Sequence, residues 1–347
     1  MIPQQDCSPQ DWQTQLRDVI RSGEELLQYL QLQAAQTGFS QLASQDFPLK
    51  VPRAFAQRMR KGDPADPLLR QVLASGRELL VAPGFGHDPV GETGDAIRQP
   101  GIIQKYHGRV LLILTGGCAI NCRYCFRRHF PYQQHQQSHA EWLQALEQIA
   151  ADSSITEVIL SGGDPLLVSD GQIRQLLERL AGIPHVQRVR VHTRLPVVIP
   201  ERVTPALLQT LGATPLDAVV VIHANHANEL DSDVAAAMHR LRAAGVTVLN
   251  QAVLLAGVND NAQTLVELSE RLFQSGVLPY YLHLLDKVQG AAHFDVSTDR
   301  ARTLHSAISA QLPGYLVPRL VRDIPGHAAK VSIASDATAG VTMEEAR

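Results

Sequence analysis

The feature that most constrains the fold is an alternation of short apolar runs and helical patterns that fills residues 110–284. Strands that are separated by helices pair in parallel, with right-handed crossovers. The alternation therefore predicts a full or partial barrel of six β/α units, with its chemistry at the carboxyl ends of the strands. The expected strands are 110–115, 157–161, 188–192, 218–223, 247–253 and 279–284, and helical patterns between them cover 140–151, 173–180, 231–244 and 262–274.

The sequence on both sides of this alternation has a different pattern of residues. Apolar residues at roughly helical spacing predict helices over 11–32 and 53–59, whereas 81–101 is rich in Gly, Pro and Asp and indicates a long ordered connection. We expect an α/β protein with three parts. These are an N-terminal helical region with its connecting loop (1–104), the β/α barrel core (105–295) and a C-terminal segment (296–347).

Composition excludes several classes of protein. The chain is 45% hydrophobic and 19% charged, with a formal net charge of -3, which argues against a disordered or fibrous protein and gives no basic field for nucleic acid or an anionic membrane. The N-terminus lacks the basic and apolar regions of a signal peptide, and no apolar run approaches the ~20 residues that span a bilayer. We therefore expect a cytoplasmic protein without nucleic-acid or membrane partners.

Three of the four cysteines lie within eight residues, directly after the first expected strand. Cys118, Cys122 and Cys125 have the spacing C-x3-C-x2-C, and a tight loop can aim all three thiols at one face of a [4Fe–4S] cluster. Three protein ligands leave one iron open for a bound substrate. Buried thiols without a ligand, or a zinc site completed by a histidine such as His129, are the alternatives. Cys7 stands apart, and we expect it to be a bystander.

The cysteine loop and the end of the second strand together resemble the radical S-adenosylmethionine (SAM) superfamily. Tyr124 precedes the third cysteine, and Ser161-Gly162-Gly163-Asp164-Pro is similar to the motif that binds the amino group of SAM. Alone, this motif could be an ordinary turn. The resemblance implies a radical SAM partial (β/α)6 barrel, SAM bound to the open iron, Gly162, Gly163 and Asp164 as cofactor-binding residues, and an electron donor that starts the radical reaction.

Further strings narrow the resemblance to one branch. They are Lys105-Tyr-His-Gly-Arg109, Cys125-Phe-Arg-Arg-His-Phe, Gln251-Ala-Val-Leu-Leu, Val258-Asn-Asp260 and Tyr281-Leu-His-Leu-Leu-Asp286. With them the chain resembles the lysine 2,3-aminomutase family, and the string that begins at Cys125 is most similar to the branch that serves (R)-β-lysylation of elongation factor P. The resemblance places Gln251 near the adenosyl moiety; the alternative is a buried glutamine that satisfies backbone groups.

This family carries pyridoxal phosphate (PLP), because an amine migrates to the next carbon readily only when its nitrogen is held as an imine. The match to the motif Asp-x-Pro-Gly-x-x-x-Lys implies that Lys330 is the Schiff-base residue. The chain has only five lysines, and Lys287, after the sixth strand, is the main competitor. Lys105, Tyr106 and Arg109 match the phosphate-binding positions; solvated charges beside a strand are the alternative.

The substrate follows from charge and from the same resemblance. Lysine presents a carboxylate at one end and an ammonium group at the other, so its site needs a fork of donors and separate acidic groups. Arg127 matches the carboxylate-binding position, and a planar guanidinium suits this role. Asp286 and Asp323 match the two aspartates that hold the ammonium group, and this pair disfavours an anionic side chain. Pairs with the neighbouring Lys287 and Arg322 are the alternatives.

The resemblance thus implies an isomerase that converts L-lysine to (R)-β-lysine, which a separate ligase passes to elongation factor P. An aminomutase of another amino acid, a radical SAM enzyme without PLP, and an iron–sulfur electron carrier without catalysis are the competing hypotheses. The oligomeric state stays open, and a homo-oligomer is possible.

Overall fold

The computed structural model describes residues 11–94, 96–132 and 139–333. Within this part of the chain, ten strands form one sheet in the order β12-β11-β10-β9-β8-β7-β6-β5-β4-β3. Seven neighbouring strands run parallel; β12 at one edge and β4 near the other pair antiparallel with them, and β3 pairs antiparallel with β4. The parallel strands are β5 (Arg109–Thr115), β6 (Glu157–Gly162), β7 (Arg188–Thr193), β8 (Asp217–Ile222), β9 (Thr247–Val253), β10 (Leu278–His283) and β11 (Arg319–Arg322), and the edge strands are β3 (Ile97–Gln99), β4 (Ile102–Ile103) and β12 (Val331–Ser332).

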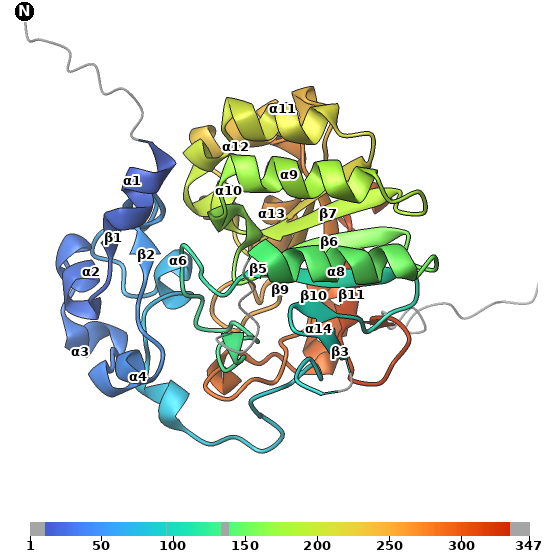
Figure 1. Ribbon diagram of the computed structural model, residues 1–347. Coiled ribbons are helices and arrows are strands. Elements are labelled where there is room, and N and C mark those ends of the chain that lie inside the picture. The colour runs from blue at the N-terminus through green and yellow to red at the C-terminus, as the bar shows by residue number, and fades with distance from the viewer. Residues whose placement is uncertain (1–10, 95, 133–138, 334–347) are drawn as a thin grey trace, which may run out of the picture.

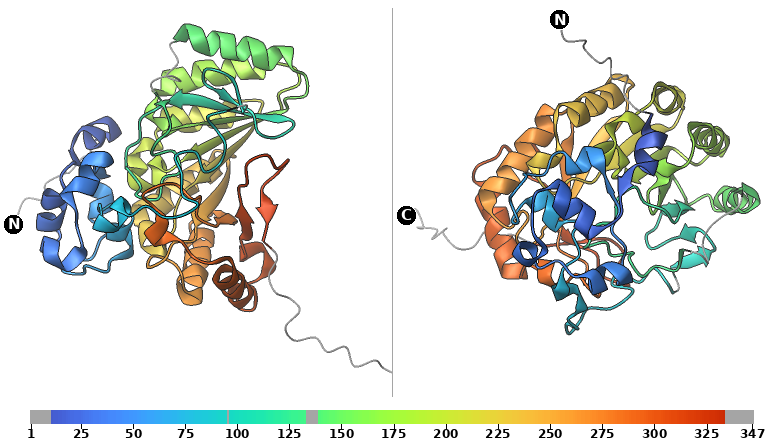
Figure 2. Two further views of the ribbon diagram at one scale, coloured as in Figure 1. Left: turned by 90° about the horizontal axis from the view of Figure 1, so that it is seen from below. Right: turned by 90° about the vertical axis from the view of Figure 1, so that its left-hand side faces the viewer.

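Strands β5 to β10 confirm the six expected strands to within one residue at each end. Helices cover the outer face of this curved sheet (Figure 2), and apolar side chains of the strands and the helices form one core cluster. The expected α/β class with a partial barrel is therefore confirmed. The outer helices are α8 (His139–Ala151), α9 (Asp170–Ala181), α11 (Pro205–Ala213), α12 (Ser232–Ala243), α13 (Ala262–Gln274) and α14 (Thr298–Ser309), with the short α10 (Leu195–Val198) after β7.

The four expected barrel helices are confirmed, whereas α11 was not anticipated. Residues at the N-terminus of α11 favour a helix start there. Thr204 accepts a hydrogen bond from the backbone N–H of Leu207, and Pro205 occupies the first turn, where proline is well tolerated. The same kind of cap starts α9 at Ser169 and α13 at Asn261. Short 3₁₀ turns connect these elements at η2 (Pro165–Leu167), η3 (Pro200–Arg202), η4 (Ala227–Glu229), η5 (Ala292–Phe294) and η6 (Gly314–Leu316).

The single helix expected over 11–32 is wrong, because the chain breaks between two short helices. Val19–Ile20 pairs with Val51–Pro52, and Ser22 starts a new helix by accepting a hydrogen bond from the backbone N–H of Glu25. The helix expected over 53–59 ends at Ala56. This region contains α1 (Trp12–Arg17), β1 (Val19–Ile20), α2 (Gly23–Tyr29), α3 (Ala34–Thr37), α4 (Gln41–Asp46), β2 (Val51–Pro52), α5 (Arg53–Ala56), α6 (Pro67–Arg70) and η1 (Gly76–Leu79).

These N-terminal elements cover one end of the barrel (Figures 1 and 2). The covered end holds the loop after β5: Asn121 donates from its backbone to the carbonyl of Lys50, and Arg123 donates to that of Gln71. Because that loop follows a parallel strand, the cover lies over the carboxyl ends of the strands. The sheet itself crosses both expected boundaries, since β3 and β4 precede residue 105 and β11 and β12 follow residue 295. None of the helices in the described part is both long and apolar enough to cross a bilayer.

Candidate active site

The three clustered cysteines lie on the loop that follows β5, and all three are free thiols that are only partly buried. Burial raises the pKa of Cys118 well above its usual value, and the neighbouring thiols add to this effect. Burial also raises the pKa of Cys125, to about 11, with Cys122 as the next cause. Three thiols that repel one another's negative charge are a donor set for a bound cation or cluster.

This loop is clamped from two sides. Arg123 donates to Glu78 at 2.8 Å and forms a fully buried ion pair with it, while Arg128 also pairs with Glu78 at 3.0 Å. Asn121 donates from its side chain to the carbonyl of Pro48 at 2.9 Å. The N-terminal elements therefore fix the conformation of the cysteine loop.

The zinc alternative for this loop finds no support in the described residues. There, no group of three His, Cys, Asp or Glu side chains converges on a single metal ion. The Nε2 atom of His129 lies 3.3 Å from the carbonyl oxygen of Gln289, and its ring stacks on that of His87. A four-iron cluster differs from a single ion, because each thiolate binds a different iron. Cys7 lies outside the described residues.

The Gly-Gly-Asp-Pro segment ends β6 beside the cysteine loop. Gly162 has φ of 124°, which an L side chain rarely adopts, and a Cβ atom on Gly163 would collide with the backbone of Gly117. Gly163 and Asp164 donate their backbone N–H groups to the carbonyls of Thr115 and Gly117, both at 2.7 Å. The glycines thus let two strand-end loops touch along their backbones.

The Asp164 carboxylate is engaged within the protein. It accepts hydrogen bonds from Thr193 Oγ1 at 2.7 Å and from the backbone N–H groups of Arg194 at 2.8 Å, Leu195 at 2.9 Å and Leu166 at 3.0 Å. It therefore ties the end of β6 to the end of β7. The prediction that Asp164 also binds SAM stays a prediction.

Arg127 is buried, and most of its N–H groups already donate hydrogen bonds within the protein. Its Nε and Nη2 atoms donate to both carboxylate oxygens of Glu92, at 2.7 and 3.0 Å. Its Nη1 atom donates to Ser161 Oγ and to the carbonyl of Gly162, each at 3.0 Å. Four of the five N–H groups of a guanidinium are thereby used. Glu92 was not anticipated, and its loop shows no period or motif that would have indicated it.

Three of the predicted side chains donate hydrogen bonds to the carboxylate of a fourth, Asp323. Asp323 accepts hydrogen bonds from Lys105 Nζ at 2.7 Å, Tyr106 Oη at 3.1 Å and Lys330 Nζ at 2.9 Å. Burial opposes ionisation of Asp323, but Lys330 and Lys105 outweigh it and lower its pKa to about 2. Arg109 stacks over the ring of Tyr106, with 4.9 Å between its Cζ atom and the ring centroid. The alternative pair of Asp323 with Arg322 is not formed, since Arg322 points its Nη2 atom at Thr298 Oγ1.

Asp286 is the second predicted aspartate, and as a whole residue it is partly buried. Its Oδ1 atom is buried and has no hydrogen-bond partner among the described residues, and burial raises its pKa to about 7 despite the attraction of Lys330. The alternative partner Lys287 lies instead over the ring of Phe85, 5.7 Å from its centroid. A buried carboxylate that lacks a partner is costly, so Asp286 is suited to a cationic ligand.

Two histidines that share this neighbourhood were missed: His283 is buried, and His192 is partly buried. Burial lowers the pKa of both His192 and His283 well below the usual value, and Lys330 lowers each further. The Nε2 atom of His192 is buried without a partner. The sequence could have indicated both histidines as site residues. His283 lies two residues after Tyr281 in the same strand, and His192 lies near the end of β7.

The remaining candidates lie on the same lumen. Gln251, on β9, pairs in register with Tyr281 of β10, and its backbone contacts the side chain of His223. His223 bonds Tyr124 Oη at 2.8 Å, while His226 caps η4. Both histidines therefore serve as hydrogen-bonding partners within the protein.

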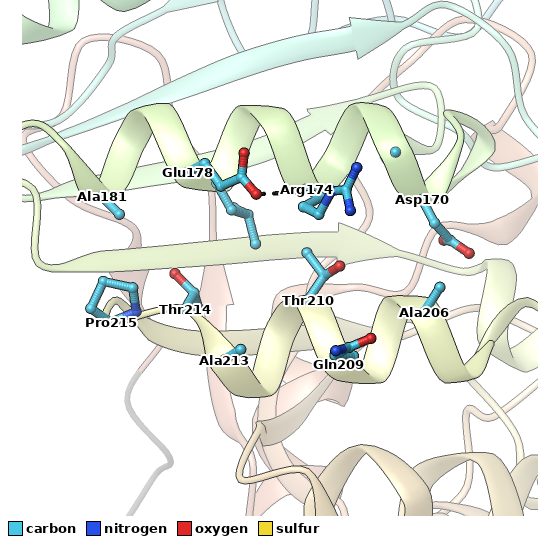
Figure 3. Close-up of a pocket in the computed structure, with 12 residues that line it drawn as sticks. Asp170, Arg174, Glu178, Ala181, Ala206, Gln209, Thr210, Ala213, Thr214 and Pro215 are labelled. Carbon is cyan, nitrogen blue, oxygen red and sulfur yellow. Dashed lines mark ion pairs between the residues drawn. The ribbon is translucent and has the colours of Figure 1, made fainter.

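A groove on the outer surface lies apart from this site. It runs between α9 and α11, where Arg174 and Glu178 form an ion pair at 3.8 Å beside Thr210 and Pro215 (Figure 3). These helices face away from the lumen. The groove therefore adds nothing to the site.

Comparison with known proteins gives clear relatives for the whole chain. Residues 112–269 match the family model described as the radical SAM superfamily. The chain is 51% identical over 327 residues to the L-lysine 2,3-aminomutase of Escherichia coli (strain K12). The matched region covers 94% of this chain and 95% of that protein. It is 49% identical over 317 residues to the L-lysine 2,3-aminomutase of Haemophilus influenzae, covering 91% and 94%.

Solved structures are more distant. A radical SAM methyltransferase from Sphaerobacter thermophilus is 18% identical, with a TM-score of 0.44, and the match covers 64% of this chain and 68% of that one. At this level of similarity the comparison adds nothing to the site.

Proposed function

The chain belongs to the family of L-lysine 2,3-aminomutases within the radical SAM superfamily, and on that premise we propose that it converts L-lysine to (R)-β-lysine in a PLP-dependent reaction at the site described above. As a family member it is an isomerase, and its cofactors are a [4Fe–4S] cluster, SAM and PLP. The observation that carries the proposal is the meeting of Lys330, Lys105 and Tyr106 at Asp323 beside the unpartnered Asp286.

Cys118, Cys122 and Cys125 would hold the cluster. The fit rests on three free thiols in one short loop and on the N-terminal residues that hold this loop in place. Three ligands leave one iron open, and Gly162 and Gly163 allow the two strand-end loops beside it to approach closely. The cluster and SAM supply the radical that abstracts hydrogen, and PLP supplies a π-system that carries the migrating nitrogen.

Lys330 would hold PLP, with Lys105, Tyr106 and Arg109 at its phosphate. The fit rests on two buried polar atoms without partners, His192 Nε2 and Asp286 Oδ1, which indicate that the lumen is built for a polar group. Asp323 forms ion pairs with Lys105 at 2.7 Å and with Lys330 at 2.9 Å, and both lysines would exchange this partner for the cofactor. Neutral His192 and His283 stand beside Lys330 and can hold or pass a proton there.

Asp286 and Asp323 would bind the side-chain ammonium of lysine, and Arg127 its carboxylate. A cation beside Asp286 supplies the partner that its buried Oδ1 atom lacks. Glu92 must share or release the guanidinium of Arg127, because it occupies the side-on edge that a carboxylate would use. The site is thus matched to a substrate with one charge of each sign.

The proposal extends to the use of the product. The string from Cys125 to Tyr132 is most similar to the branch that serves elongation factor P, which supports the transfer of (R)-β-lysine by a separate ligase to that protein in the cytoplasm. An external one-electron donor starts the reaction. A ligase assay with elongation factor P and the reaction product, followed by intact mass, tests this step.

The direct test of the activity is anaerobic incubation of the reconstituted protein with L-lysine, SAM and dithionite. We expect β-lysine, and we expect none from Cys122→Ala. A parallel incubation with L-glutamate is the specificity control, and turnover of glutamate in place of lysine would refute the assignment.

A further inference from the structure

One side chain outside the predicted site touches a cysteine of the loop directly. Arg194 follows the last residue of β7, and its side chain is buried. Its Nη1 atom donates to the Sγ atom of Cys122 at 2.7 Å. A hydrogen bond from a cation to a thiolate is among the stronger hydrogen bonds in proteins.

Partners from three regions of the chain hold this guanidinium in place. Nη1 also donates to Tyr124 Oη at 2.8 Å, while Nη2 donates to Gln71 Oε1 at 2.7 Å and Glu229 Oε2 at 2.8 Å. Phe55 packs against it, with its ring centroid 5.3 Å from the Cζ atom of Arg194. The donor is therefore fixed before any cluster is bound.

The ion pair of Arg194 and Glu229 is oriented relative to Cys122. Glu229 contacts Nη2, whereas Nη1 faces the sulfur, so the positive end of the pair is turned to Cys122. Both side chains are buried, and electrostatic interactions are stronger in such a low-dielectric place than in water.

The backbone of Arg194 is fixed as well. Asp164 Oδ2 accepts hydrogen bonds from the N–H groups of Arg194 and Leu195, at 2.8 and 2.9 Å. The strand-end motif predicted for SAM binding thereby also sets the position from which Arg194 reaches Cys122.

We propose that Arg194 is a positioning residue that raises the reduction potential of the cluster through its hydrogen bond to Cys122. This inference rests on the cluster ligation proposed above. Reduction adds negative charge to the cluster and its thiolates, so a cationic donor stabilises the reduced form more than the oxidised form. Hydrogen bonds to cluster sulfurs are a general means of setting the potential. The role also explains why a buried arginine stands beside a cysteine ligand.

The test is an anaerobic potentiometric titration, without SAM, that follows the EPR signal of the reduced cluster. The variant Arg194→Met/Glu229→Gln removes the donor together with its counter-charge, so no buried charge is left alone. We expect full iron and sulfide content, and a ratio of reduced to oxidised cluster about tenfold lower at a fixed potential, which is ~59 mV toward more negative values for a one-electron couple.

The control is Arg202→Met/Asp170→Asn. This removes another pair of a buried arginine with a carboxylate, at 2.6 Å, whose guanidinium donates to the carbonyls of Leu166 and Val168 and not to a thiol. A shift in the Arg194 variant that is no larger than in this control, or that is positive, overturns the inference.

Three further outcomes are also decisive. If the double variant assembles no cluster, Arg194→Lys is titrated in its place. Lysine keeps the positive charge but lacks the planar guanidinium, so a midpoint potential below the wild-type value supports the inference and an equal or higher one overturns it. A wild-type protein that assembles no cluster refutes the cluster ligation and with it this inference. A normal wild-type cluster with an unshifted Arg194 variant refutes the inference alone.

Discussion

In the proposed function, Lys330 is the residue on which the reaction chemistry most depends. We expect Lys330→Ala to lose the PLP absorbance near ~410–430 nm that is typical of a lysine imine, and to lose β-lysine formation at least 1,000-fold. The matched control is Lys287→Ala, because Lys287 lies over the ring of Phe85 and serves no cofactor in this account. Visible spectra of the two purified variants after PLP addition decide the matter. An unchanged spectrum in Lys330→Ala, or its loss in Lys287→Ala, would assign the cofactor to the other lysine.

Asp286 gives a pH dependence whose sign can be worked out. Its pKa in the fold is about 7, raised by burial, so the native state holds a proton that the unfolded state loses near pH 4. Stability from this group is therefore full below about pH 4 and falls as the pH rises toward 7. Only the ionised form attracts an ammonium group, so lysine should bind more weakly below pH 7.

Asp286→Asn should separate these two effects. At pH 8 we expect the variant to be more stable than the wild type by on the order of 1–4 kcal/mol, while its Kd for lysine rises at least 100-fold and loses its pH dependence. Urea unfolding and equilibrium binding at pH 6 and 8 measure both quantities. A less stable variant that still binds lysine would contradict the assignment.

At the residue scale, the sequence predicted more of the identities than of the contacts. Lys105, Tyr106, Lys330 and Asp323 were each anticipated, but their meeting at a single carboxylate was not, because it joins residues more than 200 positions apart in the chain. Glu92 could not be found, since its only signal is the bidentate contact with Arg127 in the folded protein.

At the scale of elements, the tight junction between the ends of β5 and β6 depends on glycine. A Cβ atom on Gly163 would collide with the backbone of Gly117, so Gly163→Ala should force the two strand-end loops apart and lower SAM cleavage at least 100-fold. The control is Gly171→Ala in α9, where the structure has open space and alanine should stabilise the helix by about 1 kcal/mol. The release of 5′-deoxyadenosine measures the effect. Wild-type cleavage by Gly163→Ala would show that the junction is tolerant.

The strands were predictable because buried parallel strands are continuous apolar runs, as in Glu157–Gly162 and Asp217–Ile222. The N-terminal elements were less predictable. Trp12, Leu26 and Leu30 have helical spacing, yet the pairing of Val19–Ile20 with Val51–Pro52 overrides it. That pairing is a tertiary interaction, and the spacing of one segment contains no information about its partner.

At the scale of the whole molecule, the N-terminal elements hold the loop that carries the three clustered cysteines. Glu78 holds two arginines of the cysteine loop, Arg123 at 2.8 Å and Arg128 at 3.0 Å. Glu78→Gln removes the carboxylate partner of buried Arg123 and leaves Arg128 with Asp46 at 3.4 Å, which should lower the free energy of unfolding by about 3–5 kcal/mol and speed the loss of iron to a chelator. Chemical denaturation and the rate of iron release measure the two effects. The control is Glu178→Gln, in an exposed pair with Arg174, which should change neither quantity.

In the proposed function, a cluster loop, a PLP lysine and a lysine-binding pair of carboxylates lie in one covered barrel. The most direct measurement of that claim is NMR of the product made anaerobically from L-lysine that carries ¹⁵N only on its α-amino group. The account predicts β-lysine with the label bonded to C3, since the nitrogen moves within one substrate molecule. Label released as ammonia, or recovered only at C2 from protein that has taken up its cluster, SAM and PLP, would contradict it.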